Sequence, residues 1–285
     1  MPFRRSGEPP DFVAVGHVTV DETPAGLRPG GSVLYAGLMA HQQGLRVGLL
    51  TSHGPDFPLA VLPREIEVVA VPAAATTRFA LHYTPGGRTL TLRARATPLA
   101  PVHLPPHFVE TGLAYLAPVA DEVSPDLAEA FPGAAVGVGA QGWCRVWDDE
   151  GRVRMRAWPD PDRVLRHAQA LFLSEDDVAG WEAQAVPLYQ GVPLGALTLA
   201  ARGALLFVNG ERHAIAPAPA VEIEPTGAGD VFAAGFLIRY NLTGDPFDAA
   251  AFAAVAGALT VEGDGIAGVP SREHLASRWR EAQLR

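Results

Sequence analysis

The sequence predicts an α/β fold built around a mostly parallel sheet. Residues 11–20 and 46–52 are short apolar, β-branched runs, and between them lies an amphipathic stretch, residues 33–43, that Gly44 closes. Strand, helix and strand in direct succession indicate parallel strands with helices on the faces of the sheet. The chain has 285 residues, 48% of them hydrophobic, which is enough to bury a large core.

Composition excludes several functional classes. The net charge of −9 argues against an overall basic footprint for nucleic acid. All 22 basic residues are arginines. Without lysine there is no P-loop, no Schiff-base lysine and no protein-kinase catalytic lysine. Any phosphate charge must therefore be met by backbone N–H groups, arginine or a metal ion.

The single cysteine and the distribution of apolar residues indicate the cellular setting. Cys144 has no partner for an internal disulfide, and one cysteine cannot build a zinc cluster. The first ten residues lack the apolar segment of a secretory signal, and no run of about 18 apolar residues could span a membrane. We therefore expect a cytoplasmic protein that binds neither nucleic acid nor membranes.

The middle of the chain departs from the α/β rhythm. Residues 77–83 and 88–95 alternate in polarity around a Pro-Gly-Gly turn, which predicts a β-hairpin. Its threonines and arginines indicate that one face is exposed to solvent, so we expect the hairpin to project from the main sheet. Further strands are predicted at residues 111–118 and 134–139, with a helix over residues 124–131 between them.

The stretch from Glu224 to Phe236 carries the strongest functional signal. Small residues at 227–229 let backbone N–H groups approach a ligand, and the apolar run 231–240 predicts a helix whose N-terminus favours an anion. Asp230 would repel an anion. Its place is explained if the carboxylate takes a proton from the group that attacks the anion. An Asp at an ordinary turn-to-helix junction accounts for this short pattern equally well.

Residues 137–142 spell G-x-G-x-x-G, the pattern of a dinucleotide-binding turn. That function requires a helix directly after the glycines. Residues 143–151 instead alternate like a strand and close in an acidic turn. The sequence therefore argues against a dinucleotide site here.

An acidic group follows the predicted buried strand 170–173. Ser174, Glu175, Asp176 and Asp177 stand at the carboxyl end of that strand, where open α/β sheets place their ligands. Carboxylate oxygens there suit Mg²⁺, which takes only one or two of them and keeps several waters. The same residues also make a sound N-cap and first turn for a helix over residues 175–188, and both interpretations can hold together.

The C-terminal part continues the alternation. Residues 195–199 predict a strand, residues 203–216 a strand, an Asn-Gly turn and its return, and residues 245–261 an alanine-rich helix that could floor a nucleotide base. A Gly-rich loop, residues 263–270, precedes the last predicted helix at 271–283.

Thr226-Gly227-Ala228-Gly229-Asp230 with Phe232 resembles the C-terminal signature of the PfkB/ribokinase family of carbohydrate kinases. Weaker matches follow the family's order from Asp21 to Pro270, and Gln141-Gly142-x-x-Arg145 resembles the branch with myo-inositol kinases. The resemblance implies a ribokinase-like three-layer α/β/α sandwich with a mostly parallel central sheet. It implies one domain over residues 1–285, with a small β-sheet lid inserted from about residues 18–31 and 74–97.

The resemblance also implies roles for individual residues. Asp230 is then the catalytic base, and Gly227, Ala228 and Gly229 hold the transferring phosphoryl group. The remaining roles are substrate binding by Asp21, Gly30, Gly31, Tyr35 and Arg145, nucleotide binding by Ser174, Thr198, Ala200, Gly203, Thr226 and Gly265, and metal binding by Glu175 and Asp177. Asp21 is equally explained as a turn residue that ends a strand, and Arg145 as a solvated arginine.

Five positions depart from the family pattern. Tyr35 replaces an Asn, and Ser174 and Asp177 replace the Asn and Glu of an Asn-x-x-Glu motif. Ala200 replaces a Gly, at a cost if that position requires a positive φ. A monovalent-cation site is also implied, but Glu224 stands where the family has Asp, which argues against K⁺ activation.

The implied activity is Mg²⁺- and ATP-dependent phosphorylation of a hydroxyl on a small sugar or polyol. The lid suggests a homodimer. One alternative is a nucleoside kinase, in which Tyr35 and Phe79 stack a base. The other is a non-catalytic relative, suggested by the changes at Tyr35, Ser174 and Ala200; the intact Asp230 argues against it.

Overall fold

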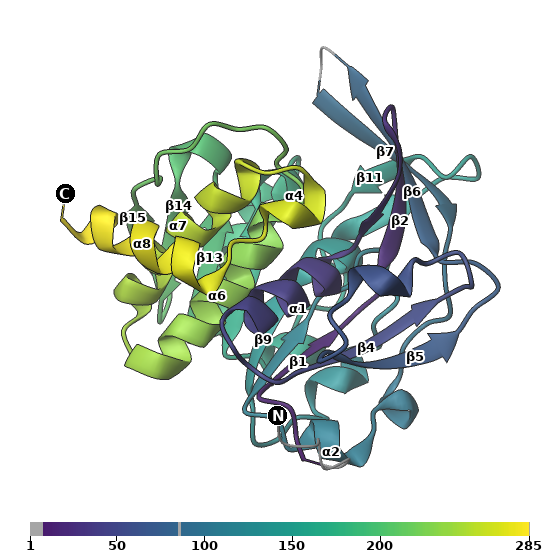
Figure 1. The fold of residues 1–285 in the computed structure, drawn as a ribbon, viewed down its shortest axis with the longest axis horizontal. Helices are drawn as coiled ribbons and strands as arrows, with labels where there is room; N and C mark the ends of the chain where they lie inside the picture. Colours follow the sequence, from purple (N-terminus) through teal and green to yellow (C-terminus); the bar gives the residue numbers. More distant parts are fainter. Residues whose placement is uncertain (1–7, 85–86, 285) are drawn as a thin grey trace.

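The computed structural model describes residues 8–84 and 87–284. Its largest element is a nine-stranded sheet in the order β15-β14-β13-β12-β9-β8-β1-β4-β5 (Figure 1). Neighbouring strands from β13 to β5 run parallel, which confirms the predicted mostly parallel sheet. Strand β14 runs antiparallel to both of its neighbours, β13 and β15. In chain order they are β1 (Phe12–Val15), β4 (Val47–His53), β5 (Glu67–Pro72), β8 (Leu113–Leu116), β9 (Ala135–Gly139), β12 (Ala170–Ser174), β13 (Leu194–Thr198), β14 (Ala204–Val208) and β15 (Glu211–Ile215).

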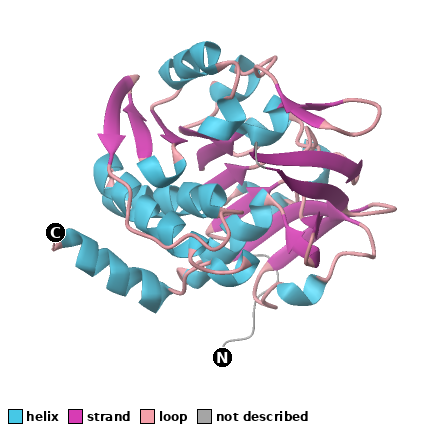
Figure 2. Ribbon diagram, turned by 90° about the horizontal axis from the view of Figure 1, so that it is seen from above, coloured by secondary structure: helices cyan, strands magenta, loops and turns pink. Residues whose placement is uncertain are grey.

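Helices cover both faces of this sheet (Figure 2). The side chains of β1 alternate between the two faces. Phe12 and Ala14 pack on one face, whereas Val13 and Val15 pack on the other, as the period of two in a strand requires. The first face carries α1 (Ser32–Gln42), α6 (Ala228–Thr243), α7 (Pro246–Val261) and α8 (Arg272–Gln283). The second carries the short helices α2 (Pro106–Val109), α3 (Asp162–Leu165), α4 (Glu175–Val178) and α5 (Glu182–Ala185).

A second sheet of four strands stands at one end of the molecule (Figure 1). It has the order β3-β2-β6-β7, and we call it the lid: β2 (Thr19–Thr23), β3 (Gly26–Gly30), β6 (Thr77–Thr84) and β7 (Gly87–Ala94). The hairpin predicted at residues 77–95 is present as β6 and β7, and its turn at 85–86 lies outside the described residues. The strand predicted over residues 11–20 is divided between the main sheet and the lid.

The two predicted helices at 124–131 and 175–188 are shorter than expected. The first is only a 3₁₀ turn, Pro125–Ala128. Its start is held by Ser124 N, which donates to Leu99 O, and Pro132 disfavours helix at the residue before it. The second is broken into α4 and α5 at Gly180, which has a φ of +85°. Both corrections arise from contacts and backbone constraints that periodicity does not report.

The glycines of the G-x-G-x-x-G segment serve close packing. A Cβ at Gly137 would lie 2.5 Å from the Leu237 side chain of α6, and one at Gly142 would lie 2.3 Å from the Pro118 backbone. Gly142 N donates to Pro118 O at 2.9 Å. A 3₁₀ turn, Ala140–Cys144, follows the glycines instead of a helix. It leads into a hairpin of β10 (Arg145–Trp147) and β11 (Val153–Met155).

The turn after β13 contains an alanine in an unfavourable backbone conformation. Ala200 has a φ of +49°, so it does adopt the positive φ that makes an alanine costly at this position. The turn is fixed at both ends, since Leu199 N donates to Gly203 O at 2.8 Å and Gly203 N donates to Ala200 O at 3.1 Å. Gly203 packs closely against the end of β15, where an added Cβ would lie 2.2 Å from Ile215 O.

We therefore expect Ala200→Gly to raise the free energy of unfolding by about 1 kcal/mol, because the strain at positive φ is removed. Urea denaturation measures this change. The matched control is the neighbouring Ala201→Gly, which has no positive φ to relieve and should lose about 0.5 kcal/mol. Equal stability of wild type and Ala200→Gly would contradict the assignment of strain to this residue.

Candidate active site

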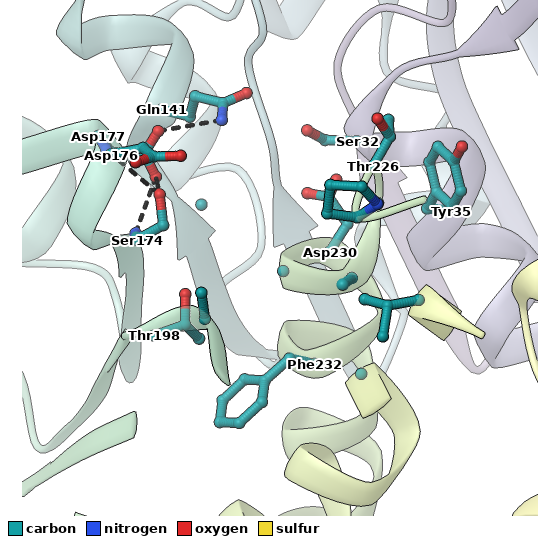
Figure 3. Close-up of a pocket in the computed structure, with 18 of the residues that line it drawn as sticks. Ser32, Tyr35, Gln141, Ser174, Asp176, Asp177, Thr198, Thr226, Asp230 and Phe232 are labelled. Atoms are coloured by element: carbon teal, nitrogen blue, oxygen red, sulfur yellow. Dashed lines mark hydrogen bonds between the residues drawn. The ribbon is translucent and has the colours of Figure 1, made fainter. Parts of the chain in front are cut away.

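One large cavity, about 730 Å³, lies beneath the lid and along the carboxyl ends of the parallel strands. Gly139, Ser174 and Thr198 line it from the ends of β9, β12 and β13, where open α/β sheets bind their ligands. Figure 3 shows two polar groups that face each other across it. Ser32, Thr226 and Asp230 lie on one side, and Gln141, Ser174, Asp176 and Asp177 lie on the other.

Asp230 lies in the first turn of α6 and opens onto the cavity. Its carboxylate hydrogen-bonds with the Ser32 hydroxyl at the start of α1, and Tyr115 donates its phenol to Oδ1 at 3.5 Å. Tyr115 reaches this position because Gly139 leaves room, since a Cβ there would lie 2.3 Å from the Tyr115 hydroxyl oxygen. Side chains from α1, β8 and α6 therefore meet at one carboxylate.

Asp230 is half-buried and opens onto the cavity. Burial raises the pKa of its carboxyl to about 7, and the negative charge of Asp177 acts in the same direction. The hydrogen bonds from Ser32 and Tyr115 and the charge of Arg145 act against this rise. A carboxyl group with such a pKa can both accept and release a proton near neutral pH, which suits a general base.

The loop before α6 is shaped by close packing between Gly227 and Tyr35. Gly227 has a φ of +83°, and a Cβ there would lie 2.2 Å from the Tyr35 ring. No side chain caps the N-terminus of α6, and a Cβ at Gly229 would meet nothing within 4 Å. Glu224 accepts a hydrogen bond from Thr226 N at 2.9 Å and so fixes the start of the loop. No side chain therefore competes for the N–H groups of this turn, one of which, Ala228 N, donates to Pro225 O at 3.3 Å.

The acidic residues on the opposite wall combine both roles considered for them. Asp177 forms a capping box with Ser174: its Oδ2 accepts from Ser174 N at 2.8 Å and Ser174 Oγ at 2.7 Å. Its Oδ1 accepts from Gln141 Nε2 at 3.0 Å. A carboxylate has about four acceptor positions, so this leaves capacity for one more partner. Glu175 forms an ion pair with Arg202, and Asp176 also lines the cavity.

The end of the cavity beneath the lid has a polar floor and an apolar ceiling. Asp21 lies on β2, where its Oδ1 accepts a hydrogen bond from Thr19 Oγ1 at 3.0 Å. Arg145 is buried, and its guanidinium lies 5.2 Å from the centre of the Phe79 ring. The ceiling comes from the lid side chains Phe79, Leu81 and Leu90. This end could hold a small molecule with hydroxyl groups on one side and an apolar face on the other.

The opposite end of the cavity is a slot between small residues. Ala218 and Ala220 line one side from the loop after β15, and α7 contributes the other. The lining residues of α7 are Ala254, Gly257, Ala258 and Val261. Small side chains on a packed helix leave room for a flat group.

Most of the residues singled out in the sequence meet in this cavity. Those that line it are Asp21, Gly31, Tyr35, Arg145, Ser174, Glu175, Asp177, Thr198, Ala200, Gly203, Thr226, Gly227, Ala228, Gly229 and Asp230. Gly265 lies instead at a smaller cavity of about 200 Å³. Gly30 packs against Asp21 and Thr19, and a Cβ there would lie 2.6 Å from Asp21 Oδ2.

Three residues with evident roles in this geometry were not singled out as site residues. Ser32 follows the Gly-Gly pair at a helix start, and Gln141 belongs to the Gln-Gly-x-x-Arg element, so each had a local signal. Tyr115 had none, since it is one aromatic residue in a buried strand. Only the fold brings its hydroxyl to Asp230.

The part of the chain that the structure describes contains neither a membrane-spanning helix nor a ready-made metal cluster. None of its helices is both long enough and apolar enough to cross a bilayer. Within residues 8–84 and 87–284, no three His, Cys, Asp or Glu side chains come together as a ready-made metal site. A metal ion at the acidic residues would thus need ligands from a substrate or from water.

The chain is similar to known kinases in sequence. Residues 151–272 match the pfkB family carbohydrate kinase model. Among curated proteins, the chain is 26% identical over 255 residues to a cytidine kinase of Thermococcus kodakarensis, a match that covers 81% of this chain and 88% of the relative.

Solved structures agree with the family match. A sulfate complex of a pyrophosphate-dependent kinase in the ribokinase family superposes with a TM-score of 0.79 at 19% identity, over 94% of this chain and 99% of that one. An Arabidopsis thaliana ribokinase with ribose and ATP gives 0.70 at 17% identity, over 95% and 99%. Thermotoga maritima ribokinase gives 0.72 at 16% identity, over 94% and 99%. Residues 151–272 thus match the pfkB family model and the chain shares the fold of these ribokinase structures, which confirms the resemblance seen in the sequence.

Proposed function

We propose that this protein transfers a phosphoryl group from ATP to a hydroxyl of a small sugar or polyol. The observation that carries the proposal is the position of Asp230, whose carboxylate faces the cavity from the first turn of a helix whose N-terminus no side chain caps. The kinase family match supports the reaction class. In this proposal Asp230 accepts the proton of the attacking hydroxyl, and its raised pKa of about 7 keeps it a competent base.

The N–H groups of Gly227, Ala228 and Gly229 hold the transferring phosphoryl oxygens in this mechanism. The chain has no lysine, so these groups and the helix dipole are the positive charge available next to Asp230, together with Arg145. Phosphoryl transfer needs position and electrostatic stabilisation more than covalent chemistry from the protein. A preformed loop held by Tyr35 and Glu224 meets that need.

Mg²⁺ fits the acidic wall opposite Asp230. Glu175 and Asp177 would hold it, with the acceptor capacity left on Asp177 and with water or phosphate as the other ligands. When bound, the ion would neutralise charge on the phosphates. Gln141 and Ser174 orient Asp177 whether or not the ion is present.

ATP is favoured as the donor by the slot of small residues at α7. The slot continues beyond the acidic wall, between Ala218 and Ala220 on one side and Gly257 and Ala258 on the other. A nucleoside triphosphate would place its base there, whereas pyrophosphate, the donor of one structural neighbour, would leave it unused.

A nucleoside acceptor is the second candidate, and the ceiling of the lid favours it. Phe79, Leu81 and Leu90 give the acceptor end an apolar surface that would cover a base better than a polyol with hydroxyls on every face. The similarity to a cytidine kinase points in the same direction. A panel of myo-inositol, ribose, fructose, adenosine and cytidine in an ADP-release assay separates the two acceptor classes.

We expect Asp230→Asn to lower turnover on the accepted panel substrate by roughly 100-fold or more, because the base is removed. ATP affinity, measured by calorimetry, and the circular dichroism spectrum should stay as in the wild type. Near-wild-type turnover in this variant would contradict the assignment of the base. Failure of the wild type on every acceptor, with ATP bound normally, would favour a non-catalytic relative.

Filling the α7 slot tests the donor assignment. We expect Ala258→Leu to raise the KM for ATP roughly tenfold with little effect on the KM for the acceptor, because the larger side chain occupies the space of the base. Ala251→Leu, two turns earlier on α7 and outside the cavity lining, is the control. Pyrophosphate should support no turnover in any variant. Efficient use of pyrophosphate, undisturbed by Ala258→Leu, would overturn ATP as the donor.

A further inference from the structure

The hairpin β10–β11 starts in the cavity and ends against the edge of the lid. Arg145 is the first residue of β10 and pairs with Met155 of β11. At the other end of the hairpin, Leu92 N of β7 donates to Gly151 O at 2.8 Å, and Thr91 bridges to Arg152 in antiparallel fashion. The hairpin therefore extends the lid sheet past β7, and Figure 1 shows β11 next to β7.

A small apolar cluster, separate from the two large cores, joins the lid, the loop after β8 and the β10–β11 hairpin. β6 and β7 supply lid residues, the loop after β8 supplies two more, and the hairpin supplies the rest. The members are Phe79, Leu81, Leu90, Leu92, Val119, Ala120, Trp147 and Val153. Arg95, just after β7, adds a polar link, since its guanidinium lies 5.7 Å from the Trp147 ring centre and donates to Asp121 O.

Arg145 is held by this cluster on two sides. Its guanidinium lies over Phe79 of the lid, and Nη1 donates to Val119 O at 2.8 Å. The Val119 loop is fixed in turn by Glu122, a carboxylate only 1% exposed, which accepts from Val119 N, Ala120 N and His17 N. The place of the Arg145 charge is therefore set by the lid, the loop and the hairpin together.

His17 ties the base of the lid to the same loop. Thr97 O can only accept, so His17 Nε2 carries the hydrogen, with a distance of 2.9 Å. Nδ1 then accepts from Thr77 Oγ1 at 2.7 Å, and Thr77 Oγ1 accepts from Ala96 N. Thr77 starts β6 and Thr97 follows β7, so both ends of the hairpin are anchored. The free edge of the lid, at β7, is where β10–β11 attaches.

We propose that the β10–β11 hairpin is a positioning element for the acceptor end of the cavity, and that Gly151 is its positioning residue. Contact between Gly151 and Leu92 seats the edge of the lid and, through the paired strands, sets Arg145 near Asp230. An acceptor that engages the lid thereby also fixes Arg145. The inference about the acceptor rests on the proposed function, but the coupling between lid and hairpin does not.

Gly151→Ala breaks this contact without touching the cavity. Gly151 has a φ of +79°, and a Cβ there would lie 2.3 Å from Leu92 O, so the two backbones must separate. Gly244→Ala is the matched control, because Gly244 has a φ of +69° and a Cβ there would meet nothing within 4 Å. The two substitutions share the backbone penalty, and only the first one displaces the lid. Val153→Ala, which thins the cluster, is a second variant if Gly151→Ala does not fold.

Hydrogen exchange followed by mass spectrometry tests the coupling in the protein without ligands. Gly151→Ala should speed exchange roughly tenfold both in residues 89–94 of the lid and in residues 141–147, relative to wild type and Gly244→Ala. Faster exchange in the lid with unchanged exchange in residues 141–147 would overturn the proposal, as would equal effects in the control.

Steady-state kinetics on the accepted panel substrate supply the second readout. Gly151→Ala should raise the KM for the acceptor roughly fivefold and leave the KM for ATP unchanged, because only the acceptor end depends on the hairpin. Equal increases in both constants would indicate a general loss of structure and contradict a positioning role. If no acceptor is phosphorylated by the wild type, the proposed function fails, and hydrogen exchange alone decides whether the coupling exists.

Discussion

The carboxylate of Asp230 lies in the first turn of α6, where burial raises its pKa to about 7. Residues from several other elements are positioned around this carboxylate. Ser32 reaches it from the start of α1, which packs on α6. Tyr115 reaches it past Gly139, where any side chain would collide with the phenol. The hydrogen bonds from Ser32 and Tyr115 favour the ionised form of this half-buried carboxylate and so oppose the rise in its pKa that burial causes. The packing of Tyr35 against Gly227 then fixes the neighbouring loop.

Small residues decide what the cavity can hold. At the donor end, alanines and Gly257 leave a slot along α7, and at the reacting centre Gly227 and Gly229 expose the backbone. At the acceptor end the larger lid residues close the space from above. The cavity therefore passes from a narrow apolar slot, through a region of backbone N–H groups and carboxylates, to a covered pocket with one arginine. This gradient supports the proposed reaction, in which the phosphates of ATP lie between its base and the acceptor.

The sequence was sufficient for the sheet, the lid hairpin and the small-residue turn before α6, because each depends on local patterns: short apolar runs, alternation around a Pro-Gly-Gly turn and a run of small residues. It also predicted strain at Ala200, which has the positive φ that a replaced glycine implies. It missed Tyr115 and overestimated the helix at 124–131, since both depend on distant contacts: Gly139 makes room for a phenol, and Leu99 O accepts from Ser124 N. The helix predicted at 175–188 was overestimated because Gly180 takes a positive φ and breaks it. The glycines at 137–142 show the converse, because a functional pattern there arises from packing against Leu237 and Pro118.

As the proposed base, Asp230 should titrate near neutral pH, and carboxyl ¹³C NMR of the labelled protein without ligands tests this most directly. The Asp230 resonance, assigned by its loss in Asp230→Asn, should shift with a midpoint near pH 7. Below that midpoint the group is protonated and cannot act as a base; above it the group is ionised and can. A midpoint close to that of an ordinary aspartate, about 4, would contradict the account.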